Sequence, residues 1–284
     1  MLIKRLRIYH TMLRKIFYSI PSSWRFWVRR IIFLPEDMLS RRSSLMPPKG
    51  LIYTGRGDFI GQGNAYVDLF IKHGDLKPNA NFLDIGSGIG RVAIPLSEYL
   101  SNTSDYQGFD VIELGVNWCQ QNITAKFENF QFKYVPLLND LYRDNGDDAA
   151  SYKFEYPESH FDFACSVSVF THMIPTEVEN YFNELERVMK PKGKIFATFF
   201  IINEENSKLM QANSGFNFNH KLDGYYLMDA TVKGANVAFE EEYLLNEIIK
   251  TDRFKITTKS YGHWCGRDKS ESFDFQDVYI IEKN

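Results

Sequence analysis

The hydrophobic positions of residues 51–284 alternate between strand-like runs and helix-like spacing. Short apolar runs bounded by turn residues predict strands, and apolar residues three or four positions apart predict helices. The predicted strands are 81–85, 106–110, 130–135, 161–167 and 194–201. The predicted helices are 64–72, 91–100, 116–126 and 176–190, with Pro191 and Gly193 after the last. This alternation predicts an α/β domain built on a parallel sheet.

The last 80 or so residues depart from the alternation. Residues 203–235 show no clear periodicity, and residues 239–250 have helical spacing. Two further strands are predicted at 254–261 and 277–282, around a long connection. We therefore expect the parallel part of the sheet to be complete before residue 203.

Residues 1–50 form a basic extension, which Pro47, Pro48 and Gly50 separate from a domain at 51–284. The extension holds 11 of the 33 Lys and Arg but only Glu36 and Asp37 among the 36 acidic residues. Apolar residues recur in it at helical spacing, at Leu2, Leu6, Tyr9, Leu13 and Ile16. Two alternatives fit residues 1–34, namely a helix pair on an anionic membrane surface and a helical cap on the domain.

Several protein classes are disfavoured by composition. No apolar stretch is long and uncharged enough to span a bilayer, and no signal-peptide pattern is found, so we expect a cytoplasmic protein. Cys119, Cys165 and Cys265 lack metal-ligand spacing, so we expect free thiols and no metal. Residues 51–284 contain 22 Lys and Arg and 34 acidic residues, so their formal net charge is −12. This negative charge argues against a nucleic-acid partner.

The clearest chemical signal follows the predicted strand 81–85. Asp84 precedes a loop in which Gly86, Gly88 and Gly90 alternate with other residues, and a helix follows. Glycines allow a tight turn, and a helix N-terminus offers unpaired N–H groups to a ligand. A dinucleotide fingerprint needs a third Gly or Ala where this chain has Arg91. An acid before the loop instead favours a ligand with a cationic amino-acid end.

The predicted strand 106–110 ends in Asp110, beside the first strand, where a carboxylate can accept hydrogen bonds from a ribose diol. The two acids and the glycine loop together fit S-adenosylmethionine. Neighbouring residues complete the predicted cofactor site, namely Ser87, Arg91, Val111, Asn139 and Ser166.

These motifs resemble the class I S-adenosylmethionine-dependent methyltransferases, in particular bacterial glycosyltransferase-associated and uncharacterised small-molecule members. The resemblance rests on LDIGxGxGR from Leu83, GFD ending at Asp110, FDFxxSxSVFTHM from Phe161 and a late GxWxGR...QD, and it runs from about Gly55 to the C-terminus. It implies a Rossmann-like seven-stranded sheet with an antiparallel last strand. It also implies that the glycine loop holds the methionine part, that Asp110 holds the ribose, and that no metal is needed.

The resemblance leaves two assignments uncertain, the adenine contacts and the role of the stretch 53–61. The adenine is usually held after the third strand, where Val135, Pro136 and Leu137 stand in place of the common acid. The stretch 53–61 is either a lid over the cofactor or a plain linker with turns.

Two histidines are candidates for the catalytic step. His172 follows the predicted strand 161–167, where a general base for an oxygen acceptor is needed, although it could instead cap the next segment. His263 belongs to a cluster with Trp264 and Arg267 that could bind a sugar or an acidic acceptor, or could be an ordinary loop.

The sequence thus predicts a metal-independent methyltransferase that acts on a small molecule or a saccharide, on an oxygen atom. Two alternatives are a non-catalytic S-adenosylmethionine-binding scaffold and a nicotinamide-dependent Rossmann oxidoreductase. Neither the acceptor nor the oligomeric state follows from the sequence.

Overall fold

The computed structural model describes residues 22–40, 42–53, 57–138, 146–212 and 215–284. The chain divides into two compact units, Met1–Gly57 and Asp58–Asn284. In the first unit, the described helix is α2, Ser22–Leu39, followed by a short turn at Lys49–Leu51. No helix in the described part of the chain has the length and apolar character needed to cross a membrane.

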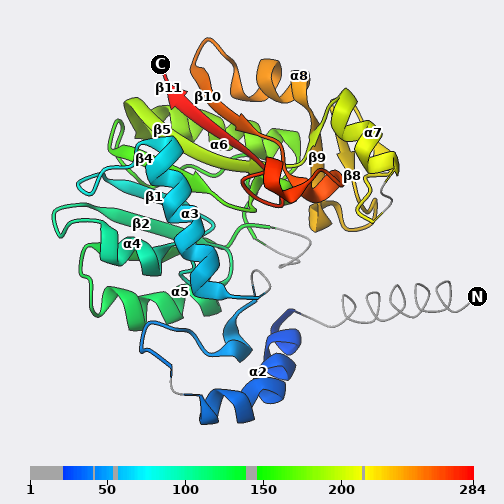
Figure 1. Cartoon of the computed structure of the whole chain (residues 1–284). Coiled ribbons are helices and arrows are strands. Elements are labelled where there is room, and N and C mark those ends of the chain that lie inside the picture. Colours follow the sequence, from blue (N-terminus) through cyan, green and yellow to red (C-terminus); the bar gives the residue numbers. More distant parts are fainter. Residues whose placement is uncertain (1–21, 41, 54–56, 139–145, 213–214) are drawn as a thin grey trace, which may run out of the picture. The chain divides into compact units, whose positions relative to one another are not determined.

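A seven-stranded sheet forms the centre of the second unit (Figure 1). Its strands are β1 Phe82–Ile85, β2 Tyr106–Asp110, β3 Phe130–Tyr134, β4 Phe161–Ser166, β5 Met189–Phe199, β10 Phe254–Ser260 and β11 Asp277–Lys283. The order is β10-β11-β5-β4-β1-β2-β3. Strands β1 to β5 are parallel, and β11 is antiparallel to both β5 and β10. The predicted Rossmann-like sheet with an antiparallel last strand is therefore confirmed.

Helices cover both faces of this sheet. They are α3 Phe59–Gly74, α4 Ala93–Tyr99, α5 Glu113–Cys119 and α6 Pro175–Val188, and a π-helical segment, Gln120–Thr124, continues α5. Helix α3 crosses the front of the sheet in Figure 1, and its Phe70 ring packs on Phe82, Phe163 and Phe196. Because side chains alternate along a strand, Asp84 lies on this α3 face, as Phe82 does.

The opposite face of the sheet is buried under α6. Tyr181, Phe182 and Leu185 of α6 belong to the same buried cluster as Leu83 and Ile85 of β1. Pro175 at the first turn suits a helix start. The β1 strand is thus buried on both sides, as a central parallel strand requires.

A second, four-stranded sheet lies beside the first, in the order β6-β9-β8-β7. Its strands are β6 Ile201–Ile202, β7 His220–Lys221, β8 Tyr225–Leu227 and β9 Val237–Glu240, with helix α7 at Glu204–Ala212. Residues 203–235 therefore contain regular structure that their sequence pattern does not predict. Strands of two or three residues are too short to show an alternation of apolar and polar positions.

Several predicted boundaries are wrong. Helix α3 begins at Phe59 rather than at residue 64, so the last residues of the stretch 53–61 belong to this helix. Residues 237–240 are strand β9, so the helical segment predicted at 239–250 begins at α8, Glu241–Tyr243, and continues as the π-helical Leu244–Ile249. Strand β5 begins at Met189, directly after α6, and contains Pro191 and Gly193. Between its pairs with Phe161 and Phe163, the β4–β5 register shifts, and this irregularity accommodates a proline and a glycine inside a strand.

Candidate active site

The glycine loop connects β1 to α4 and depends on left-handed backbone. Gly86, Gly88 and Gly90 have φ values of +75°, +58° and +82°. A Cβ atom at Gly86 would lie 2.3 Å from Val169 Cγ2, and one at Gly90 would lie 2.6 Å from Ile123 Cδ1. Both backbone conformation and space therefore require glycine at these two positions.

The amide groups of this loop already have acceptors. The Gly86 and Ser87 amides donate to the Phe109 carbonyl, at 2.9 and 3.0 Å, and the Gly90 amide donates to the Ser87 carbonyl. The Gly88 amide donates to Asp110 Oδ2 at 2.8 Å. The end of β2 accepts three of these hydrogen bonds and Ser87 accepts the fourth, so these four N–H groups are used within the fold. The loop contributes a tightly fixed shape instead.

Asp110 joins the loop to the end of β2. Its Oδ1 atom accepts a hydrogen bond from the Ile112 amide at 2.8 Å, while Oδ2 holds Gly88. The residue is 8% exposed. Burial raises the pKa of this carboxyl to about 6, against the opposing effect of the amide hydrogen bonds. Each carboxylate oxygen keeps a second lone pair, so the group can still accept from a ligand hydroxyl.

Asp84 lies beneath the loop rather than beside open space. It is 2% exposed and accepts hydrogen bonds from Tyr106 Oη at 2.5 Å and from Cys165 Sγ at 3.3 Å. Burial raises the pKa of Asp84, and these two hydrogen bonds and the charge of Arg91 oppose the rise. The carboxyl group thus organises the buried polar centre under the loop, with a cationic side chain nearby.

Two buried hydroxyl groups at this sheet edge have no hydrogen-bond partner. They are Ser87 Oγ, in the glycine loop, and Ser166 Oγ, at the end of β4. Ser166 is in register with Ile85, the residue before the loop, so it belongs to the same edge. A buried hydroxyl without a partner is costly, and it marks a place where a ligand or water completes the hydrogen bonding.

The remaining predicted cofactor residues differ in position. Arg91 donates to Gln62 Oε1 at 3.2 Å, and its guanidinium lies 5.4 Å from the centre of the Tyr66 ring. Val111 is partly buried directly after Asp110. Asn139 lies outside the described residues, as does the central part of the proposed lid, 54–56.

His172 lies in a short turn, Phe170–His172, beyond the end of β4. Its Nδ1 atom is 2.7 Å from the Gly234 carbonyl oxygen. A carbonyl only accepts, so Nδ1 carries the proton, and in the neutral ring Nε2 carries the lone pair. Burial lowers the pKa of His172, and hydrogen bonds to the backbone of Gly234 and Ala235 oppose this fall. The Gly234 carbonyl thus orients the imidazole in this turn.

The loop between β10 and β11 approaches the same sheet edge, although its partners were not apparent from the sequence. Gln276 Oε1 accepts from Ser168 Oγ at 2.9 Å, and Ser168 lies between β4 and the His172 turn. Tyr66 of α3 donates to Asp274 Oδ2 at 2.8 Å. Gln276 belongs to the late QD motif, whereas Tyr66 belongs to none, and the partners of these two residues are 108 and 208 residues away in the sequence.

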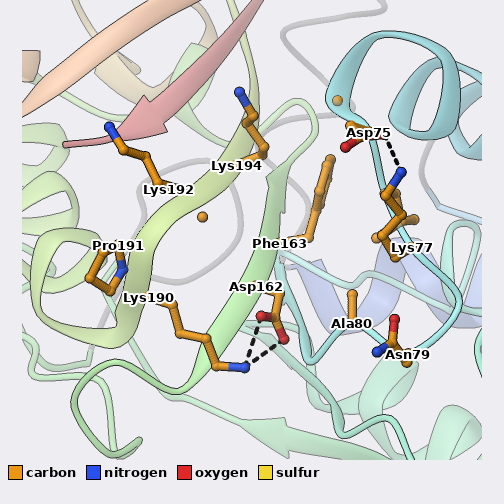
Figure 2. Close-up of a pocket in the computed structure, with 13 residues that line it drawn as sticks. Asp75, Lys77, Asn79, Ala80, Asp162, Phe163, Lys190, Pro191, Lys192 and Lys194 are labelled. Carbon is orange, nitrogen blue, oxygen red and sulfur yellow. Dashed lines mark hydrogen bonds and ion pairs between the residues drawn. The ribbon is translucent and has the colours of Figure 1, made fainter.

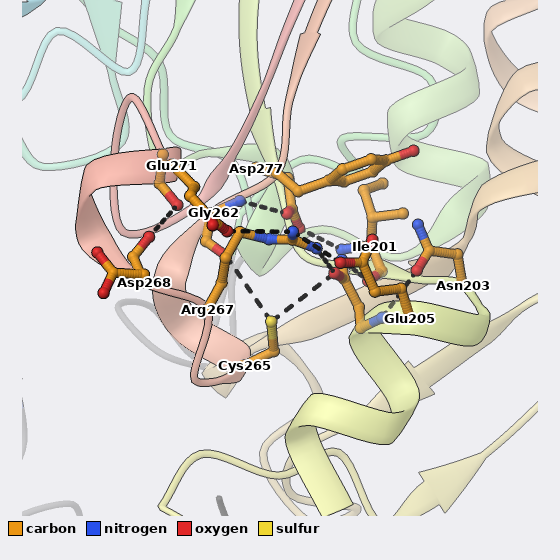
Figure 3. A network of polar contacts seen from close by, with 12 residues as sticks. Ile201, Asn203, Glu205, Gly262, Cys265, Arg267, Asp268, Glu271 and Asp277 are labelled. Carbon is orange, nitrogen blue, oxygen red and sulfur yellow. Dashed lines mark hydrogen bonds and ion pairs between the residues drawn. The ribbon is translucent and has the colours of Figure 1, made fainter.

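Trp264 and Arg267 of this loop make internal contacts, and Figure 3 shows Arg267 and Asp277 within this polar network. The indole of Trp264 donates to the fully buried Asp277 at 2.8 Å, together with the amides of Gly262 and Ile201. Arg267 donates to Glu205 and to Asn206. These contacts connect the loop to α7 and the second sheet, which favours the alternative of an ordinary loop for this Trp and this Arg.

His263, the other candidate base, differs from Trp264 and Arg267 in its hydrogen bonding. Its Nδ1 atom is buried without a hydrogen-bond partner, and its ring packs edge-on against Phe275 at 5.4 Å. No contact joins it to the glycine loop among those of the described residues.

A separate pocket of about 480 Å³ opens at the amino ends of β1, β4 and β5 (Figure 2). Lysines line it, but Lys190 is paired with Asp162 and Lys77 with Asp75. Lys194 is paired with Glu282. The pocket lies at the edge of the sheet opposite the glycine loop, so it is no part of the candidate site. Among the described residues, no group of three or more His, Cys, Asp or Glu is placed to hold a metal ion.

Comparison with known proteins agrees with this geometry. Residues 83–197 match the family model described as a methyltransferase domain. The chain is 25% identical over 199 residues to the cyclopropane-fatty-acyl-phospholipid synthase of Escherichia coli strain K12, an alignment that covers 69% of this chain and 45% of that protein. The chain thus spans less than half the length of this curated relative.

Two solved structures share the fold. The PH0226 protein from Pyrococcus horikoshii OT3 is 14% identical, with a TM-score of 0.55 over 81% of this chain and 93% of that one. The cyclase SpnF is 16% identical, with a TM-score of 0.51 over 82% of this chain and 84% of that one. Residues 83–197 are therefore similar to a methyltransferase domain, and the two structures show the same fold.

Proposed function

We propose that this protein transfers a methyl group from S-adenosylmethionine to an oxygen atom of a small molecule or saccharide, without a metal, through the domain at 51–284. The observation that carries the proposal is the pair of unpartnered hydroxyls, Ser87 Oγ and Ser166 Oγ, beside a glycine loop that Asp110 fixes.

The residues at this edge fit the cofactor by their chemistry. Asp110 accepts from the ribose hydroxyls with its remaining lone pairs, and the two serine hydroxyls supply donors and acceptors for polar atoms nearby. Asp84 and the three glycines shape the methionine end, where the sulfonium and ammonium are cationic. Arg91, Val111 and Asn139 complete the proposed contacts. When bound, S-adenosylmethionine supplies a methyl group on a cationic sulfur, which becomes a neutral thioether after transfer.

His172 is the proposed general base. With Nδ1–H directed at the Gly234 carbonyl, Nε2 is the atom that accepts the proton of the acceptor hydroxyl. Its lowered pKa keeps the ring neutral before the reaction. The resulting imidazolium keeps its hydrogen bond to Gly234. His263 stands as a second candidate, because its loop contacts the residues around the His172 turn through Gln276 and Thr171.

A lipid acceptor is the second candidate. It is favoured by the similarity to an enzyme named for fatty-acyl phospholipids and by the apolar character of residues 24–39. Peripheral contact of residues 1–34 with a membrane belongs to this part of the proposal.

The proposal is tested by incubating the full chain with methyl-labelled S-adenosylmethionine and fractionated host extract. We expect label in a small-molecule or glycan fraction, and no label with Asp110→Ala. Label in the lipid fraction would favour the second candidate. Cofactor binding with no label in any fraction would contradict methyl transfer and leave the scaffold alternative.

A further inference from the structure

Helix α2 displays a continuous apolar face to solvent. Of the large hydrophobic side chains exposed in the described part of the chain, most belong to this one helix, namely Trp24, Trp27, Val28, Ile31, Ile32, Leu34, Met38 and Leu39. Trp24, Trp27 and Ile31 are 67%, 64% and 66% exposed. A continuous apolar surface of this kind marks an interaction site.

The exposed side chains occupy one side of the helix. At 3.6 residues per turn, the eight positions fall within about 160° of arc. We name this surface the α2 apolar face, defined by the eight residues given above. Pro35 falls within the same arc and supplies no charge.

The opposite side of α2 is occupied within the first unit. Asp37 accepts from the amides of Lys49 and Gly50, at 2.7 and 3.1 Å, and pairs with Arg42. Glu36 pairs with Lys49, whose ammonium also lies 5.0 Å from the centre of the Phe33 ring. The helix thus has an inner side held by its own unit, and an outer side that is apolar.

The charges of residues 1–50 indicate which kind of partner the α2 apolar face binds. Glu36 and Asp37, the only acidic residues among 1–50, are both paired with neighbouring cations on the inner side. Arg30 is exposed and borders the apolar face, with its guanidinium 5.8 Å from the centre of the Trp27 ring. The rest of the extension is rich in Lys and Arg. An apolar face that contains Trp24 and Trp27 and is bordered by Arg30, in a strongly basic segment, complements the headgroups and upper acyl chains of an anionic bilayer.

We propose that the α2 apolar face docks on an anionic lipid bilayer, with the helix lying in the plane of the interface. Trp24, Trp27 and Ile31 enter the acyl boundary, and Arg30 remains at the level of the lipid phosphates. The acidic remainder of the chain is repelled by the same surface, which favours contact through this segment alone. This inference deepens the membrane contact proposed above, and it does not depend on methyl transfer.

The test is flotation of the full chain with vesicles of phosphatidylcholine, with and without phosphatidylglycerol. We expect flotation with the anionic vesicles, and a loss with added salt because the charge attraction is screened. The double variant Trp24→Ser/Ile31→Ser should lower the bound fraction about tenfold or more. Leu222→Ser is the matched control, an exposed apolar residue in the other unit, and should float like the wild type.

Tryptophan fluorescence provides a second readout in the same sample. Trp24 and Trp27 are exposed, whereas Trp118 and Trp264 are buried, so a blue shift on adding vesicles reports α2. Cofactor binding by the variants serves as the check on folding. Equal flotation of wild type and double variant, or no flotation, would overturn the proposal. Tryptophan emission that is already blue-shifted without lipid would also overturn the proposal, because the α2 apolar face would then be covered by the rest of the protein or by a second copy. Sedimentation distinguishes these two cases.

Discussion

The carboxylate of Asp110 holds the amide of Gly88 at 2.8 Å, so a side chain from the end of β2 fixes the loop that follows β1. The same carboxylate is the proposed ribose acceptor. Loop geometry and cofactor binding therefore share one titratable group, which makes the cofactor affinity sensitive to pH.

We predict that affinity for S-adenosylmethionine falls as the pH drops below about 6. The pKa of Asp110 is raised to about 6, and hydroxyl donors bind its ionised form, so each pH unit below that value should weaken binding about tenfold. Calorimetric titrations between acidic and neutral pH measure this. In Asp110→Asn, binding should be weaker and lose this pH dependence. A wild-type affinity that stays constant across the range would contradict the role of Asp110.

Replacing Ser166 by Ala should separate binding from stability. Because Ser166 Oγ is buried without a partner, its removal should leave the free energy of unfolding unchanged or raise it. The affinity for the cofactor should fall by up to about tenfold, the value of one hydrogen bond. Ser104→Ala is the control, since its hydroxyl donates to the Pro78 carbonyl at 2.8 Å. Ser104→Ala should lose stability but keep its affinity for the cofactor. Lost stability with unchanged affinity in Ser166→Ala, and lost affinity with unchanged stability in Ser104→Ala, would refute the assignment of Ser166 to the cofactor site.

Gly86→Ala should destabilise the protein by about 2 to 4 kcal/mol. The left-handed backbone costs about 1 to 2 kcal/mol, and the contact with Val169 adds a packing cost of similar size. A double-mutant cycle with Val169→Ala, followed by denaturant unfolding, separates the two terms. The second substitution should relieve only the packing part. Full additivity would show that the contact between the added methyl group and Val169 has no energetic weight.

His172→Gln should reduce turnover by about 10² to 10⁴-fold while cofactor affinity is kept. In the wild type, the pKa of His172 lies below 6.5 because of burial, so kcat/KM should be level from pH 6.5 upward and decline at lower pH as the ring is protonated. The matched comparison is His263→Gln under the same conditions. If only His263→Gln loses activity, the base is assigned to the wrong histidine.

Trp264→Phe should cost about 1 to 3 kcal/mol of stability, and more at pH 8 than at pH 5. Burial raises the pKa of Asp277 to about 7, so its contribution to stability is greatest below its unfolded pKa near 3.8 and declines as the pH rises to 7. The indole N–H stabilises the ionised form, so its loss matters most where Asp277 is charged. Trp118→Phe controls for ring size, and thermal unfolding at both pH values measures the effect. A pH-independent loss would contradict the role of the indole.

The sequence predicted the parts of the site that are local in the chain. The strand, glycine loop and helix around Gly86 are contiguous, and Asp110 ends the next strand, so period and spacing suffice to place them. Period and spacing do not predict the acceptors of the loop amides at Phe109 and Asp110, because these depend on the pairing of two strands.

Long-range contacts account for the other differences. The sequence of Trp264 and Arg267 suggests a ligand site, but their partners Asp277 and Asn206 come together only in the fold. The four-stranded sheet was missed because its strands are short, and the apolar side of α2 became clear only when the inner side had been located. Polar residues in a loop are therefore weaker predictors of function than residues at the end of a central parallel strand.

The most direct test of the central claim is a calorimetric titration of the full chain with S-adenosylmethionine and, separately, with an oxidised nicotinamide dinucleotide. We predict that S-adenosylmethionine binds at one site, that Asp110→Ala abolishes this binding, and that the dinucleotide does not bind. Binding of the dinucleotide without binding of S-adenosylmethionine would contradict the account and restore the oxidoreductase alternative.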